Sequence, residues 1–129
     1  MRRIGSEDTP TVYAVRVAAS ARDALLAERD RRAELFGRAQ AIDWYNGALA
    51  ALRSLATYPE RCTLAPEDDL LPEAAVRQLL YPPRRSRAWR LLFTVHEADA
   101  DDPPNVRVHH ARHSTQTRLS EWPREEDED

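Results

Sequence analysis

The sequence predicts an α+β domain of two layers, in which a helical hairpin packs on a small antiparallel sheet in the order β-α-α-β-β-β. A short alternating strand and two helix-length stretches fill the first half, and three further runs with strand character follow residue 75. A polar connection punctuated by proline, residues 60–73, separates the two halves. With 129 residues, the chain is long enough for one modest core.

The helical half begins with a strand at 11–18, where Tyr13, Val15 and Val17 alternate with other residues. Ser20 opens the sequence S-A-R-D, whose Ser-x-x-acid form is typical of a helix N-cap. This helix is expected to end near Gly37, because glycine adopts the left-handed conformation that terminates helices.

A second helix is predicted at about 38–57. Its apolar residues recur at steps of three and four and form one stripe: Ala41, Tyr45, Ala48, Leu52 and Leu55. Trp44 is expected in the core beside that stripe. Tyr58-Pro59 ends the helix, since proline cannot continue it and restricts the residue before it.

The three later strands are predicted at 76–81, 88–97 and 105–113. One arginine lies on each of them: Arg77, Arg90 and Arg112. If the strands pair as one antiparallel sheet, these side chains are expected to converge on one groove suited to phosphate or carboxylate. The alternative is that Arg77 and Arg90 make ordinary cross-strand ion pairs with Glu73, Glu97 or the acidic loop at 98–105.

Charge is strongly segregated along the chain. Residues 77–118 hold eight arginines against four acids, whereas residues 119–129 hold one arginine against six acids. We expect a flexible N-terminus at 1–11, a folded domain at 12–118 and an acidic, disordered tail at 119–129, in which Trp122 has no obvious core to join. Alternatively, the tail folds back over the basic groove as an intramolecular competitor for a nucleic acid or an acidic partner.

The basic residues and histidines limit the available chemistry. All nineteen basic residues are arginines, so a lysine base or Schiff base is excluded. His110 and His113 are the best candidate proton acceptors, because imidazole titrates near cellular pH. His109 and His113 are predicted to share one strand face about 13 Å apart, too far for one zinc ion, with His110 on the other face. No metal and no cofactor are expected.

Cysteine content and hydropathy indicate the compartment. Cys62 is the single cysteine, which excludes an intramolecular disulfide and favours a reducing compartment. The sequence contains no apolar run long enough to span a membrane, and no apolar run follows the basic N-terminus as in a secretory signal. A cytoplasmic protein without a membrane partner is expected.

Several motifs together resemble the RelE/ParE superfamily of bacterial toxins from type II toxin–antitoxin modules. The similarity covers roughly residues 12–118 and rests on W-Y-N-x-A-L-x-A-L-x-S-L-x-x-Y-P-E-R-C at 44–62, L-A-P-E at 64–67, V-R-Q-L-L-Y at 76–81, W-R-L-L-F-T-V at 89–95 and V-x-H-x-R-H at 108–113. The resemblance implies a growth-inhibiting toxin, as in plasmid-stabilisation modules, that forms a heteromer with its cognate antitoxin. RelE-like members cleave mRNA on the ribosome, and ParE-like members poison DNA gyrase.

The resemblance also assigns candidate site residues. Arg77, Arg90 and Arg112 match basic positions of the RNA-cleaving members, with His110 or His113 as the proton acceptor. However, Leu79 replaces a second basic residue, and the C-terminal region that usually supplies a tyrosine reads S-T-Q-T-R-L. These departures favour a ParE-like toxin that binds a target such as gyrase. The alternatives are a RelE-like endoribonuclease and a non-toxic protein-binding module of the same fold.

Overall fold

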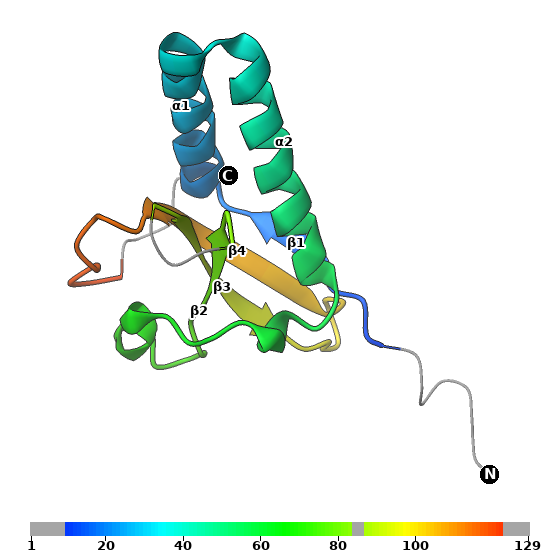
Figure 1. The fold of residues 1–129 in the computed structure, drawn as a ribbon. Helices are drawn as coiled ribbons and strands as arrows, with labels where there is room; N and C mark the ends of the chain where they lie inside the picture. The colour runs from blue at the N-terminus through cyan, green and yellow to red at the C-terminus, as the bar shows by residue number, and fades with distance from the viewer. Residues whose placement is uncertain (1–9, 84–86, 123–129) are drawn as a thin grey trace.

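The computed structural model describes residues 10–83 and 87–122, in which a helical hairpin lies against a four-stranded sheet (Figure 1). The hairpin consists of α1 (Ala19–Phe36) and α2 (Arg38–Arg53). The sheet consists of β1 (Ala14–Val17), β2 (Arg77–Tyr81), β3 (Trp89–His96) and β4 (Asn105–His113). Short 3-10 turns at Ser54–Ala56, Pro59–Arg61 and Pro66–Leu70 connect the two layers. The predicted α+β class and the element order are confirmed.

The direction of one strand differs from the prediction. The strand order is β1-β4-β3-β2, and β1 pairs with β4 in parallel, with Ala14 opposite Asn105. The sheet is therefore mixed and not wholly antiparallel. The remaining pairs, β2 with β3 and β3 with β4, are antiparallel as expected. Local sequence does not determine the direction of β1, because its partner β4 lies far along the chain. A parallel pair needs a long crossover connection, and the elements between β1 and β4 provide one.

The two ends of α1 are formed differently. Gly37 has a φ of 98° and donates its N–H to the Ala33 carbonyl, so the helix ends where the sequence predicts. The expected N-cap at Ser20 is wrong. Ala18 is the N-cap residue, and its methyl side chain offers no capping acceptor. Its backbone N–H donates to the Val108 carbonyl of β4, which fixes the start of the helix against the sheet. Ser20 lies inside the first turn and donates its hydroxyl to the His109 carbonyl at 3.3 Å.

Both helices pack on the sheet, α1 against β4 and α2 against β2. Ala41, Ala48, Leu52 and Leu55 of the predicted stripe are buried, and Trp44 is buried beside them. The α-helix itself ends at Arg53, earlier than predicted, and a 3-10 turn continues it to Ala56. Tyr58 then adopts a left-handed φ of 48° before Pro59. Trp44, Leu52 and Leu55 share the main core with four residues of the sheet: Leu91, Phe93, Val106 and Val108.

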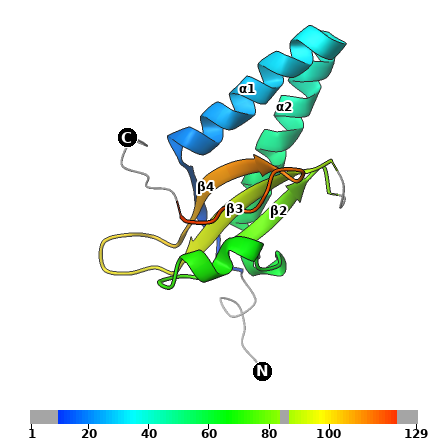
Figure 2. The same ribbon diagram turned by 90° about the vertical axis from the view of Figure 1, so that its left-hand side faces the viewer.

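Alternation along β3 divides the sheet into two faces. The hairpin face carries Trp89, Leu91 and Phe93, which join the main core. The second face, turned away from the hairpin, carries Arg90, Leu92 and Thr94. There Leu92 forms a smaller core with Ala65, Val76, Leu71, Leu119 and Trp122. The second face is therefore partly covered by the chain itself, as the view turned by 90° in Figure 2 shows.

Within the described part of the chain, neither helix combines the length and the apolar character that a bilayer crossing requires.

Candidate functional site

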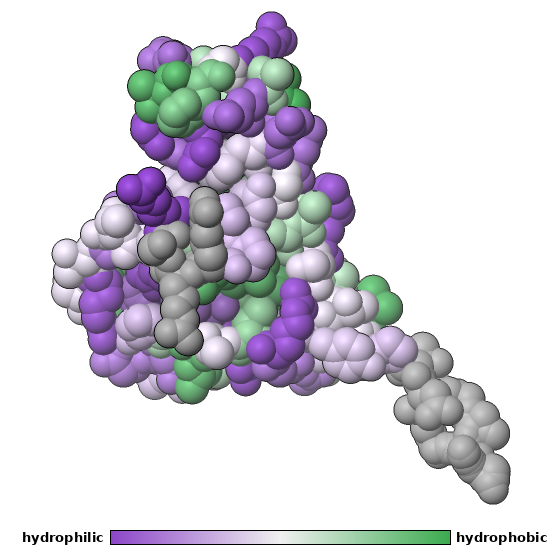
Figure 3. Space-filling model, viewed as in Figure 1, coloured by the Kyte–Doolittle hydropathy of each residue, from purple (hydrophilic) through white to green (hydrophobic). Residues whose placement is uncertain are grey.

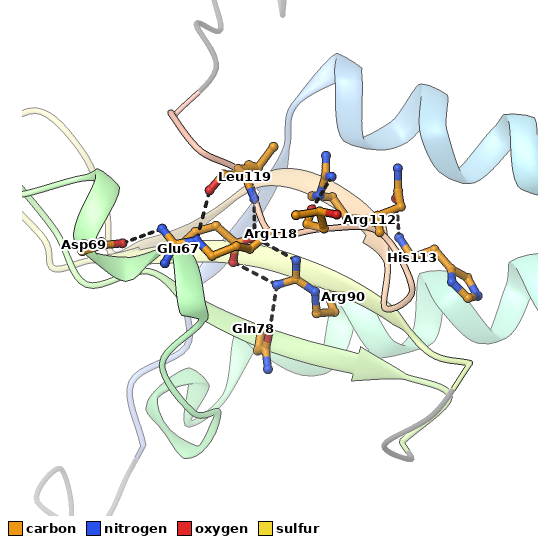
Figure 4. A network of polar contacts seen from close by, with 10 residues as sticks. Glu67, Asp69, Gln78, Arg90, Arg112, His113, Arg118 and Leu119 are labelled. Carbon is orange, nitrogen blue, oxygen red and sulfur yellow. Dashed lines mark hydrogen bonds and ion pairs between the residues drawn. The ribbon is translucent and has the colours of Figure 1, made fainter.

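The centre of the second face is a buried ion pair between Arg90 and Glu67 (Figure 4). Arg90 Nη2 lies 2.8 Å from Glu67 Oε2, and Arg90 Nη1 lies 2.9 Å from Glu67 Oε1. The Glu67 side chain is fully buried and the Arg90 side chain is 9% exposed. Burial alone would raise the pKa of Glu67, but hydrogen bonds from Arg90 and from the Leu119 N–H, with the charge of Arg90, lower this pKa to about 2. The ion-pair alternative for Arg90 is thus realised with Glu67, a partner that sequence reasoning missed.

Arg112 lies beside this pair, whereas Arg77 does not. Arg112 is opposite Arg90 in the strand register and donates from Nη2 to the Thr117 carbonyl at 2.8 Å. Arg77 is opposite Phe93 and donates to the Cys62 carbonyl at 2.6 Å. The expected convergence of three arginines is therefore wrong. Arg77 is paired with Phe93, so it lies on the hairpin face of the sheet, whereas Arg90 lies on the second face. Arg90 and Arg112 do share one face.

A bulge in β4 rearranges the histidines. Leu92 is opposite His110 and Phe93 is opposite Val108, so His109 is the extra residue of the bulge. His109 and His110 consequently both lie near Trp122, with ring centroids 5.4 and 4.9 Å away. His113 packs edge-on against Trp89, at a centroid distance of 5.9 Å. The prediction that His109 and His113 share a face is wrong, because the extra residue turns His109 to the second face. His110 does lie on the face opposite His113.

The bulge also brings His109 close to His96, so that both imidazoles contact the hydroxyl of Thr94. This arrangement was not predicted. Thr94 is fully buried, and its hydroxyl lies 2.7 Å from His96 Nε2 and 2.8 Å from His109 Nε2. One hydroxyl can donate to only one ring nitrogen, so when both imidazoles are neutral they carry their protons on different nitrogens. Burial lowers the pKa of His96, and the charges of Arg107, His109 and Arg16 lower it further. These contacts favour the neutral form of the His96 imidazole.

This histidine pair lines an open cleft of about 810 Å³ between β3, β4 and Trp122. Arg107 also lines the cleft, together with four carboxylates: Glu73, Glu97, Asp99 and Asp102. Arg16 neutralises Asp102 at 3.2 Å, and Glu97 accepts a hydrogen bond from the Tyr13 hydroxyl at 2.9 Å. The remaining acidity disfavours a polyanion in this cleft.

The C-terminal segment, residues 114–122, crosses the second face and contacts it through hydrogen bonds, an ion pair and apolar packing. Leu119 donates its N–H to Glu67 Oε2 at 3.1 Å, and Arg118 forms an exposed ion pair with Asp69 at 2.8 Å (Figure 4). Leu119 and Trp122 pack on the smaller core. The expectation that Trp122 has no core to join is therefore wrong. The N-terminal residues 1–9 and the acidic residues 123–129 lie outside the described part of the chain.

Among the described residues, no group of three or more His, Cys, Asp or Glu side chains is arranged to hold a metal ion. Cys62 is buried, and burial raises the pKa of its thiol, which disfavours the reactive thiolate.

Comparison with known proteins identifies a relative by fold. No protein-family model matches the chain, and no curated protein matches its sequence. A solved chain of the chromosomal ParDE TA system from P. aeruginosa superposes with a TM-score of 0.59 at 16% sequence identity. The superposition covers 80% of this chain and 97% of that chain. The two chains share a fold over nearly the whole length of that solved chain.

Proposed function

We propose that this chain is the toxin of a type II toxin–antitoxin module and that it arrests growth by binding a target such as DNA gyrase. The observation that carries this proposal is the fold shared with a chain of a ParDE TA system over 97% of that chain's length. The motifs on β2, β3 and β4 that resemble the RelE/ParE superfamily support it independently. A fold alone does not fix an activity, so the choice between binding and cleavage rests on the second face.

The contacts on the second face favour binding over RNA cleavage. Arg90 is held by Glu67 in a buried bidentate pair and has little exposed surface to offer a phosphate. Arg77 is engaged with the Cys62 carbonyl, away from Arg90. An RNA-cleaving site needs cationic groups facing the scissile phosphate and a proton acceptor beside them. The arginines and His113 are not gathered around one such position.

The second candidate is a RelE-like endoribonuclease, and one observation favours it. The pair of His96 and His109 provides two imidazoles bridged by the Thr94 hydroxyl in an open cleft, with Arg107 nearby. Two histidines can act as base and acid in 2′-OH attack. The carboxylates of the same cleft repel a phosphodiester, and for this reason we rank cleavage second.

The proposed regulation and location follow from the toxin assignment. A cognate antitoxin is the expected partner, and the active toxin and its heteromer with the antitoxin would occupy the cytoplasm, where gyrase and ribosomes are found.

Inducible expression of the chain alone in a bacterium tests the proposal. We expect growth arrest with intact mRNA and a DNA-damage response, because a gyrase-binding toxin leaves broken DNA. The double variant His96→Asn/His109→Asn should arrest growth as the wild type does, since binding needs no proton transfer. Its accumulation and melting temperature serve as the folding control.

Three other outcomes would count against the proposal. Cut mRNA whose cleavage disappears in the histidine double variant would assign the endoribonuclease. Cut mRNA that persists in that variant would place cleavage elsewhere on the chain. Normal growth at a confirmed level of folded protein would assign a non-toxic binding module of the same fold.

A further inference from the structure

The outer end of the α1–α2 hairpin projects beyond the sheet (Figures 1 and 2). The buried residues of α1 are Ala21, Leu25 and Glu28, all in the part nearer the sheet. From residue 29 to the end of α1 at Phe36 none of its residues is buried. Helices in proteins are stabilised mainly by tertiary packing of an apolar face. The outer half of α1 receives little of this packing within one chain.

The end of this arm exposes large apolar side chains. Leu35 is 57% exposed, Phe36 is 56% exposed and Ile42 is 41% exposed. They account for half of the six large hydrophobic residues that are exposed in the described part of the chain. Figure 3 shows the corresponding hydrophobic patch at the top of the hairpin. Clustered exposed apolar residues are typical of an interaction surface.

A hollow lies beside this patch, in the groove between the two helices. Its volume is about 350 Å³, and it is lined by Arg29, Asp30, Ala33, Arg38, Ala41 and Ile42. The two alanines leave room between the helices where larger residues would fill the groove. A cavity of about 150 Å³ already accommodates a benzene ring, so this hollow is large enough for the ring of a phenylalanine.

The charges around the patch are balanced. Residues 28–43 contain four arginines and four acidic residues. Such a surface does not select a strongly acidic or basic partner. It can complement a second copy of itself, because in a twofold contact the arginines of one copy can lie near the acidic residues of the other.

We propose that the arm tip, formed by Leu35, Phe36, Ile42 and the adjacent hollow, is a homodimer interface occupied by a second copy of this chain. Phe36 of each copy enters the hollow of the other. A twofold contact requires that one patch be both donor and acceptor of a side chain, and the tip carries the protruding ring and the hollow together. The two arms then form a four-helix arrangement that buries the apolar end of each hairpin. The proposal goes beyond the toxin assignment and does not depend on it.

The oligomeric state of the purified full-length chain tests the proposal. Light scattering after gel filtration should give twice the 14.8 kDa mass of the chain at micromolar concentrations. Phe36→Asp should weaken self-association at least tenfold, because it removes the apolar ring that fills the hollow and buries surface there. Val12→Asp is the matched control, since Val12 is 66% exposed but belongs to the opposite end of the chain's fold. It should remain dimeric.

A cross-linking experiment makes the test specific to the tip. Because Cys62 is the single cysteine and is buried, a new cysteine can be linked selectively with a short bis-maleimide. Leu35→Cys should give a covalent dimer, and Val12→Cys should not. A chain that stays monomeric up to about 0.1 mM, or a dimer that survives Phe36→Asp, would overturn the proposal. Unchanged circular dichroism and melting temperature of each variant exclude unfolding as the cause.

Discussion

Glu67→Ala is expected to lower the free energy of unfolding by about 3–5 kcal/mol, because it leaves the buried Arg90 guanidinium without its counter-charge. Arg90→Ala should cost a similar amount, since it strands a fully buried carboxylate. Urea denaturation at pH 7 measures both. Domains of this size are stable by about 5–15 kcal/mol, so loss of the cooperative transition is also an expected result for either variant.

The double variant Glu67→Leu/Arg90→Met removes both charges of the pair and keeps similar side-chain volume. It should recover most of the stability lost by either single variant, because apolar residues of similar volume avoid the cost of burying charge. Asp69→Ala is the matched control. Its ion pair with Arg118 has the same 2.8 Å separation, but both side chains are largely exposed, so its loss should cost less than about 1 kcal/mol. An equally small effect of Glu67→Ala would contradict the structural role of the buried pair.

The same pair predicts an acid sensitivity. The folded-state pKa of Glu67 is about 2, below the usual value of 4.5. A group with a lowered pKa contributes stability above its unfolded-state pKa and loses that contribution as the pH falls toward the folded-state value. The wild-type chain should therefore lose part of its stability between about pH 5 and pH 2, and the double variant Glu67→Leu/Arg90→Met should lack this part. Urea midpoints across that pH range measure the difference.

The elements predicted well from the sequence are those determined by neighbouring residues. Gly37 ends α1 because glycine is suited to the left-handed exit, and the step of three and four residues in α2 defines its buried face. The strands β2, β3 and β4 follow from their apolar runs and intervening turns. In each case the determining interactions lie within a few residues.

The features that the sequence did not reveal depend on distant contacts. Glu67 is 23 positions from Arg90 and lies in an acidic 3-10 turn, where nothing distinguishes it from Asp68 or Asp69. Its burial depends on the return of Leu119 across the second face. The extra residue at His109 has no compositional signal either, although it decides which histidines meet. Both candidate sites were therefore beyond prediction in detail, although two of the three arginines expected together, Arg90 and Arg112, do lie on one face.

Gly47→Ala is expected to lower the free energy of unfolding by about 1–3 kcal/mol through overpacking. A Cβ at Gly47 would overlap the Tyr81 hydroxyl and lie 2.9 Å from Tyr81 Cζ. That hydroxyl donates to the Trp44 carbonyl at 2.9 Å, and the Tyr81 ring packs on the Trp44 ring, so moving the phenol away would disrupt both contacts. Chemical denaturation measures the loss. In the absence of the overlap, the same substitution would stabilise a helix by about 1 kcal/mol.

The effect of Tyr81→Phe on stability is expected to have opposite signs in the wild-type chain and in the Gly47→Ala chain. Tyr81→Phe in the wild-type chain should cost about 1 kcal/mol, because the hydrogen bond to the Trp44 carbonyl is lost. In the Gly47→Ala chain the same change should instead increase stability, since removal of the hydroxyl relieves the overlap. Asn46→Ala, at the adjacent exposed position of α2, is the control and should be neutral or slightly stabilising. If Tyr81→Phe destabilises both chains equally, Gly47 and the Tyr81 hydroxyl are not in contact, and the close approach of α2 to β2 is wrong.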